Sequence, residues 1–178
     1  FLTMKLEKIF LLLFAFCVLP ADVSFAGEAA RAFSNGVRFA RAGQTDFAHM
    51  EFRAILKDHP RSRFYSPALF AAGEYFFLMG NHAEARAAFQ DYAARDPEAN
   101  SKMIALAFLW KIADIEKDEA AAGQAVREIV NIKQVSLVFR KSQEYQYLSP
   151  MNQHYLAVVH IDHIDIFVGG KLFVEIPY

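Results

Sequence analysis

Histidine and aspartate recur in one short stretch near the C-terminus, His160-Ile161-Asp162-His163-Ile164-Asp165. Imidazole nitrogens and carboxylate oxygens are common ligands of divalent metal ions. Because alternate residues of a strand share a face, His160 would pair with Asp162, and His163 with Asp165. The two pairs would point in opposite directions, and each would fall short of the three protein ligands of a catalytic zinc. The stretch therefore predicts a polar patch at a strand irregularity, with a metal-binding protein or metal-dependent enzyme as the alternative.

Other motifs that carry catalysis are absent from the sequence. It contains no G-x-S-x-G, no phosphate-binding glycine loop, no H-E-x-x-H and no Cys-His arrangement. No pair of carboxylates has a setting that would single out an acid/base couple. We therefore expect a non-catalytic protein with no cofactor and no bound metal.

The composition and the charge of the chain exclude a disordered protein and argue against a nucleic-acid-binding one. The chain has 178 residues, and 54% of them are hydrophobic, which excludes a disordered chain. The 19 basic and 20 acidic side chains leave a net charge of −1. Phosphate binding needs a basic surface, so we expect no nucleic-acid partner.

The first 26 residues have the pattern of a secretory signal peptide. Lys5 and Lys8 precede an eleven-residue apolar run, Ile9 to Leu19, and Ser24-Phe25-Ala26 then has small residues at the two positions that a signal peptidase recognises. A membrane span needs about 20 apolar residues, so this run is too short to be one. We predict cleavage after Ala26 and a periplasmic mature protein.

Cys17 raises the alternative of an outer-membrane lipoprotein. The large Phe16 precedes it, where a lipoprotein signal has a small residue, so lipidation is disfavoured. Membrane association is expected only if Cys17 carries lipid. Without Cys17 the mature chain has no cysteine, which suits an oxidising periplasm.

Two stretches of the chain superpose when one is shifted by 37 residues. Gly36 and Gly73 lie inside helical patterns, where glycine is costly unless another helix approaches closely. Gly43 and Gly80 lie where these first helices should end. The matched pairs are Gly36/Gly73, Phe39/Phe76, Gly43/Gly80, Ala48/Ala85, Phe52/Phe89 and Pro60/Pro97.

The second helix of each pair has its own boundary signals. Asn81 is a candidate N-cap, and Glu84, three residues on, would complete a capping box. Pro60 and Pro97 should end the second helices.

The order G-x-x-F, G, A-x-x-x-F, P resembles the tetratricopeptide repeat, with Phe39 and Phe76 at the usual tyrosine position. The longer period is similar to repeats of bacterial envelope proteins, such as the outer-membrane assembly lipoprotein and the Tol–Pal accessory protein. The resemblance covers roughly residues 28–132. It implies a helical solenoid that binds other proteins.

A third helix pair should follow the two matched copies. Ser101 to Lys117 has a broad apolar face, and Ala122, Val126 and Ile129 continue the pattern after Asp118. We therefore expect a mainly α chain, a tetratricopeptide-like α-solenoid of about three helix pairs, over residues 27–133.

Residues 134–178 change to an alternating pattern and predict a small antiparallel β unit of three to five strands. Ser149-Pro150 marks a turn, and Gly169-Gly170 a two-residue hairpin. The sheet should pack against the last helix pair or swap into a partner, unless the chain is a fragment of a longer protein. The alternating sets are Val135/Leu137/Phe139, Tyr145/Tyr147, Tyr155/Ala157/Val159/Ile161 and Ile164/Ile166/Val168.

The resemblance also implies a groove lined by the first helix of each pair. The alternative is that Phe33, Phe70 and Phe77 are core residues, because most large apolar side chains are buried. The helix Tyr65–Met79 is apolar nearly all round, so it must be covered on more than one side. The implied partner-binding groove consists of Phe33, Val37, Arg41, Phe70, Glu74, Phe77, Ala107 and Lys111.

These observations together predict a non-catalytic scaffold in the periplasm. Its partner would be another protein or peptide of the cell envelope, in outer-membrane assembly or cell-wall machinery, held in the groove or by strand addition at the edge of the β unit. The alternatives are metal chemistry at His160–Asp165 and a self-associating subunit that dimerises through its sheet.

Overall fold

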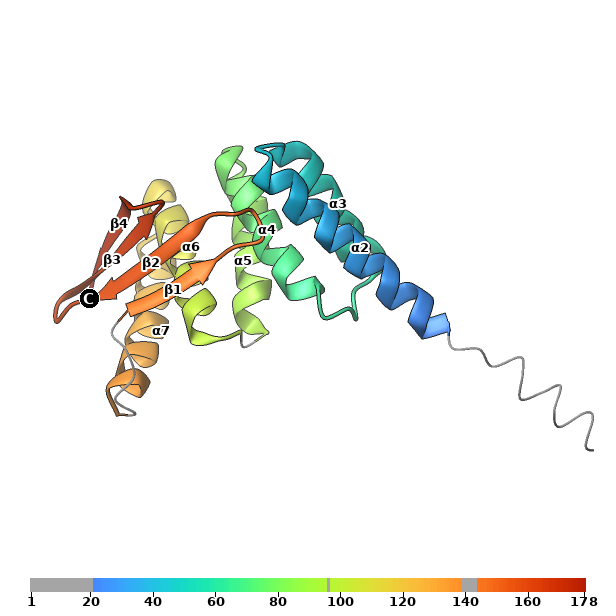
Figure 1. The fold of residues 1–178 in the computed structure, drawn as a ribbon. Coiled ribbons are helices and arrows are strands. Elements are labelled where there is room, and N and C mark those ends of the chain that lie inside the picture. The colour runs from blue at the N-terminus through green and yellow to red at the C-terminus, as the bar shows by residue number, and fades with distance from the viewer. Residues whose placement is uncertain (1–20, 96, 139–143) are drawn as a thin grey trace, which may run out of the picture.

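The computed structural model describes residues 21–95, 97–138 and 144–178. This part of the chain forms helices followed by one sheet, as predicted (Figure 1). The helices are α2 (Ala21–Arg41), α3 (Thr45–Asp58), α4 (Tyr65–Leu78), α5 (His82–Ala94), α6 (Ala99–Glu116) and α7 (Glu119–Val138). The strands are β1 (Glu144–Leu148), β2 (His154–Val159), β3 (His163–Val168) and β4 (Lys171–Pro177).

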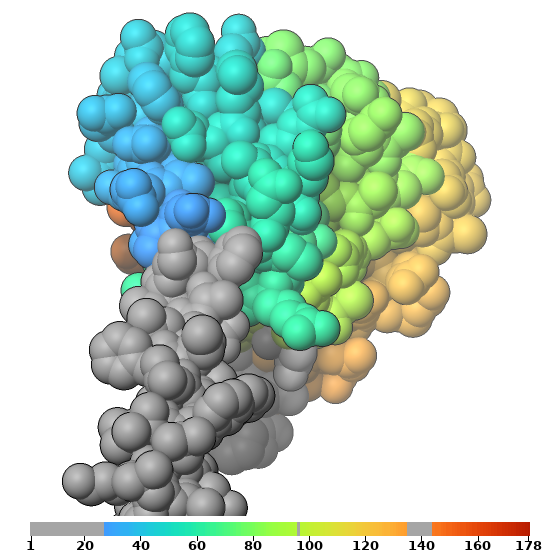
Figure 2. Space-filling view, turned by 90° about the vertical axis from the view of Figure 1, so that its right-hand side faces the viewer, coloured from blue at the N-terminus to red at the C-terminus, as the bar shows by residue number. Residues whose placement is uncertain are grey.

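The helices form three consecutive pairs, α2/α3, α4/α5 and α6/α7. Neighbouring pairs also contact each other, α3 against α4 and α5 against α6. In Figure 2 the surface passes in order from blue through green to yellow as one pair follows the next. This solenoid-like arrangement confirms the predicted fold class. No helix in the described ranges is both long and apolar enough to cross a bilayer.

In each of the first two pairs, a glycine of the first helix lies against a phenylalanine ring of the second, and we call this the glycine–phenylalanine contact. A Cβ atom on Gly36 would lie 2.7 Å from the ring of Phe52, and one on Gly73 would lie 2.9 Å from the ring of Phe89. Each ring therefore rests on the bare backbone of the helix beside it. The predicted close approach is confirmed, and its cause is the phenylalanine of the second helix.

The first helices of these two pairs end in the same way. Gly43 and Gly80 both have φ of 72°, a left-handed conformation that glycine adopts without strain. The next N–H groups reach back into the helix: Gln44 donates to the Phe39 carbonyl at 2.9 Å, and Asn81 to the Phe76 carbonyl at 2.8 Å.

The predicted capping box at the start of α5 is wrong. Asn81 precedes the helix but makes no side-chain cap hydrogen bond. In a capping box Glu84 would accept a hydrogen bond from the backbone N–H of Asn81. That N–H already serves the end of α4.

The four strands form an antiparallel sheet in the order β1-β2-β3-β4. Gly169 and Gly170 join β3 to β4 with φ of 55° and 80°, which confirms the two-residue hairpin. The predicted turn at Ser149-Pro150 joins β1 to β2.

Two details of the strand prediction are wrong. Residues 135–138 continue α7, because β2 ends at Val159 and offers them no partner strand. Ile161 does not continue β2; it lies in the β2–β3 turn and is 94% exposed. Residue 139 and the first 20 residues of the predicted signal peptide lie outside the described residues.

The inner face of the sheet packs on α6 and reaches back to α4. Phe108 of α6 contacts Tyr155 of β2 and Phe173 of β4, with ring centroids 5.8 and 5.2 Å apart. Phe70 of α4 contacts Tyr147 of β1 at 4.8 Å. The predicted packing on the last helix pair is therefore confirmed and extends to the second pair.

Candidate functional site

Half of the predicted partner groove is buried within the chain, and three of these four residues contact the sheet. Phe70, Glu74 and Ala107 have 0%, 1% and 0% of their surface exposed. Phe77 is half-buried between Phe108 and Phe173. The expected exposed aromatic anchor is thus wrong for Phe70, because α4, which is apolar nearly all round, is covered by Tyr147 and Tyr155.

Glu74 is the polar member of this buried contact. The hydroxyl of Tyr155 donates to Glu74 Oε1 at 2.6 Å. Burial raises the pKa of Glu74 to about 8, although hydrogen bonds from Tyr155 and Ser149 favour the charged form. Glu74 therefore holds the sheet on α4 and does not face a partner.

Lys111 of α6 was also predicted to line the groove. It is half-buried, and its ammonium group pairs with the Asp114 carboxylate at 3.4 Å.

The remaining predicted groove residues lie together on α2. Phe33 and Val37 are half-buried, and Arg41 is exposed. They border an open depression of about 480 Å³, which we call the α2 groove. Two of its lining residues, Phe33 and Phe64 just before α4, stack on each other with ring centroids 4.9 Å apart. The α2 groove is lined by Ala30, Phe33, Ser34, Val37, Arg38, Arg41 and Phe64.

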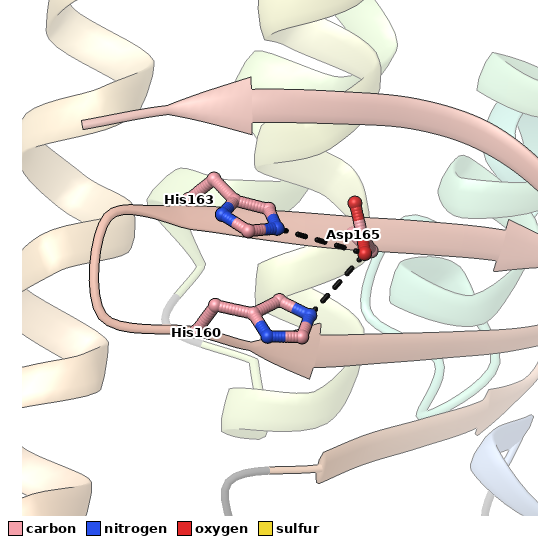
Figure 3. A group of neighbouring side chains, drawn as sticks. All are labelled: His160, His163 and Asp165. Atoms are coloured by element: carbon pink, nitrogen blue, oxygen red, sulfur yellow. Dashed lines mark ion pairs between the residues drawn. The ribbon is translucent and has the colours of Figure 1, made fainter.

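A second cluster, formed by His160, His163 and Asp165, lies at the β2–β3 turn (Figure 3). The His160 N–H donates to the His163 carbonyl at 2.9 Å, which closes a two-residue turn of Ile161 and Asp162. The two imidazoles therefore stand side by side, stacked at 4.2 Å. Asp165, two residues after His163 on β3, lies on the same face.

This geometry changes the predicted pairing. His163 and Asp165 share a face, as expected, but His160 joins them and does not pair with Asp162. The cause is the turn: two intervening residues place His160 and His163 opposite each other, whereas an uninterrupted strand would place them on opposite faces. The sequence therefore predicts two ligands per face where the fold brings three together.

Both imidazoles are directed at one carboxylate oxygen of Asp165. His160 Nε2 lies 3.2 Å from Asp165 Oδ2, and His163 Nε2 lies 3.8 Å from the same atom. All three ligand atoms lie within 4.8 Å of one another. The dashed lines in Figure 3 show both imidazoles directed at this carboxylate.

Asp162 orients one of the two imidazoles. Its Oδ1 lies 2.7 Å from His163 Nδ1. This hydrogen bond is the main reason that the pKa of His163 is raised and that of Asp162 is lowered. It places a proton on Nδ1 and directs Nε2 toward Asp165.

The turn is held by residues that sequence reasoning missed. Lys133 of α7 donates its ammonium group to the carbonyls of His160 at 2.6 Å and Ile161 at 2.9 Å. The Tyr178 N–H donates to the Asp162 carbonyl at 3.0 Å. No local pattern around Lys133 signals these contacts, which join segments 27 and 28 residues apart.

The chain matches no protein-family model, no curated protein and no solved structure.

Proposed function

We propose that this chain is a non-catalytic scaffold of the bacterial cell envelope, of the tetratricopeptide type, that binds a segment of another envelope protein in the α2 groove. The proposal is supported by the repeated glycine–phenylalanine contact, Gly36 with Phe52 and Gly73 with Phe89, which makes the first two helix pairs equivalent. Stacked helix pairs of this kind present extended binding surfaces.

The observation that carries the proposal is the difference between α2 and the helices that follow. Tyr147 and Tyr155 of the sheet cover Phe70 and Glu74 of α4, and Ala107 of α6 is fully buried. The corresponding side of α2 keeps an open depression that the stacked rings of Phe33 and Phe64 help to line. An apolar lining beside polar margins is what an anchoring side chain of a partner needs.

The charges of the α2 groove define the partner's chemistry. Arg38 and Arg41 line it, and none of the lining residues in the described part of the chain is acidic. We therefore expect an acidic segment with at least one large apolar side chain. The apolar residue would lie on Phe33 and Val37, and the carboxylates would pair with the arginines.

The proposed location depends on residues 1–26. Their basic start, short apolar run and small residues before the expected cleavage site support export to the periplasm. A fusion of residues 1–26 to a reporter enzyme that is active only in the periplasm tests this step, and an inactive reporter would overturn it.

Site-specific photocrosslinking in cells tests the binding proposal. A crosslinking residue at Ser34, an exposed member of the α2 groove, should capture one defined envelope protein. The same residue at Ala87, exposed on α5, is the matched control and should not capture it.

Charge reversal then makes the test specific. Arg41→Glu should abolish capture, whereas Lys57→Glu, at an exposed position on α3, should leave it unchanged, with both variants retaining the helical circular-dichroism signal. Equal capture by wild type and Arg41→Glu, or capture from Ala87 alone, would overturn the proposal.

A further inference from the structure

We infer that His160, His163 and Asp165 form a binding site for one divalent transition-metal ion of the Zn²⁺ class. This inference does not depend on the scaffold function, because the β2–β3 turn and the α2 groove share no residue.

The spacing of the ligand atoms fits such an ion. Zinc bonds to imidazole nitrogen and carboxylate oxygen are about 2.0–2.2 Å long, so tetrahedral ligand atoms stand about 3.4 Å apart. The two distances from Asp165 Oδ2 to the imidazole Nε2 atoms, 3.2 and 3.8 Å, lie on either side of this value. Small side-chain rotations would therefore complete the coordination.

The ligands are also held in advance. His160 and His163 are opposite residues of a closed hairpin turn, so their backbones are fixed relative to each other. Asp162 accepts a hydrogen bond from His163 Nδ1, the arrangement by which an outer carboxylate orients a metal-binding imidazole. Lys133 fixes the turn through two of its carbonyl groups.

The acidic side chains beside Asp165 favour a cation, although the ammonium group of Lys133 lies at the backbone of the same turn. Asp165 lies directly opposite Glu175 in the β3–β4 register, and like charges at such positions destabilise a sheet. Asp165 Oδ1 is buried and has no hydrogen-bond partner among the described residues. Protonation of the imidazoles would offset part of this negative charge, and a divalent ion bound between them would offset more of it.

The donor set also limits which ion binds. Two imidazoles and one carboxylate suit zinc, cobalt and similar ions, whereas calcium and magnesium prefer oxygen ligands throughout. Three protein ligands leave a coordination position for water, and the side chain of His160 is 41% exposed toward solvent.

Calorimetric titration of the untagged protein with Zn²⁺ tests the site, and Co²⁺ absorbance provides a second readout. We expect one ion per chain. His160→Ala should weaken binding at least about 10-fold, and Asp162→Asn, which removes the outer carboxylate, should weaken it about 10-fold. His154→Ala is the matched control, because His154 is exposed on the same strand-turn unit and lies outside the cluster.

The experiments distinguish loss of the metal site from loss of the fold. His160 is exposed, so its substitution should leave the fold intact by circular dichroism. Absence of Zn²⁺ binding, or binding that His160→Ala and Asp165→Asn leave unchanged, would overturn the inference. Crosslinking from Ser34 should be unaffected by His160→Ala, so a failed metal site and a failed scaffold are distinguishable.

Discussion

The hydroxyl of Tyr155 on β2 donates a 2.6 Å hydrogen bond to the buried carboxyl of Glu74 on α4. These residues are 81 positions apart, and their contact closes the second helix pair against the sheet. Burial raises the pKa of the Tyr155 hydroxyl well above its usual range, so it remains a donor in alkaline as well as in neutral solution.

Stability should fall as pH rises through the Glu74 titration. The pKa of Glu74 is about 8 in the folded chain, against an ordinary 4.5. Between these values the folded chain holds a proton that the unfolded chain has lost. The stabilisation is therefore complete below pH 4.5 and lost above about pH 8, with a slope approaching about 1.4 kcal/mol per pH unit.

Urea denaturation at pH 5, 7 and 9 checks this expectation. Glu74→Gln keeps an acceptor for Tyr155 but cannot ionise, so its stability should depend less on pH than that of wild type. Glu84→Gln, at an exposed position on α5, should retain the wild-type slope. Equal slopes for wild type and Glu74→Gln would contradict the assignment.

Phe70→Ala should destabilise the fold, because Phe70 is fully buried among aromatic rings of α5, α6 and the sheet. We expect the free energy of unfolding to fall by about 3–5 kcal/mol. Phe47→Ala, at a position 55% exposed, should cost at most about 1 kcal/mol. A Phe70→Ala protein that stays stable but loses partner capture would return Phe70 to the binding groove.

Gly73→Ala should be destabilising by about 1–3 kcal/mol, although alanine favours helices. The new Cβ would lie 2.9 Å from the ring of Phe89, which is fully buried and stacked on Phe108. Gly123→Ala in α7 is the control: its Cβ meets only the end of the Arg127 side chain at 3.4 Å. Thermal denaturation should show Gly123→Ala as neutral or stabilising. Similar losses of stability in both variants would argue against the glycine–phenylalanine contact as the cause.

Lys133→Met should loosen the β2–β3 turn. The ammonium group bonds two turn carbonyls and lies 4.2 Å from the centre of the Tyr178 ring. Hydrogen exchange should therefore accelerate at the amides of His160 and Tyr178, while amides of α4 stay protected. Lys117→Met, which removes an exposed lysine, should leave both amides unchanged. Unaltered exchange in Lys133→Met would show that the turn holds without it.

The helical part of the fold could be predicted because its signals are local. Gly43 and Gly80 end helices through their own backbone conformation. Gly36 and Phe52 recur as Gly73 and Phe89 at the same offset of 37 residues, so one comparison of the chain with itself finds both glycine–phenylalanine contacts. The strand prediction failed over residues 135–138, because alternation of apolar residues forms a strand only where a neighbouring strand supplies hydrogen bonds.

The sites were predicted less well than the elements. The helix containing Phe70 was expected to be covered on more than one side, yet nothing in its periodicity names Tyr147 and Tyr155 as the cover. His163 and Asp165 were placed on one face by strand geometry. His160 was not, because its face depends on where the strand stops and the turn begins.

The amino-acid order alone determined three helix pairs, a hairpin at Gly169-Gly170 and the residue types available for binding. Only the tertiary structure decided that the sheet closes α4 and leaves the α2 groove open, and that three metal-type ligands meet at one turn. The reason is physical: backbone conformation follows from neighbours along the chain, whereas burial and convergence depend on which distant surfaces pack together.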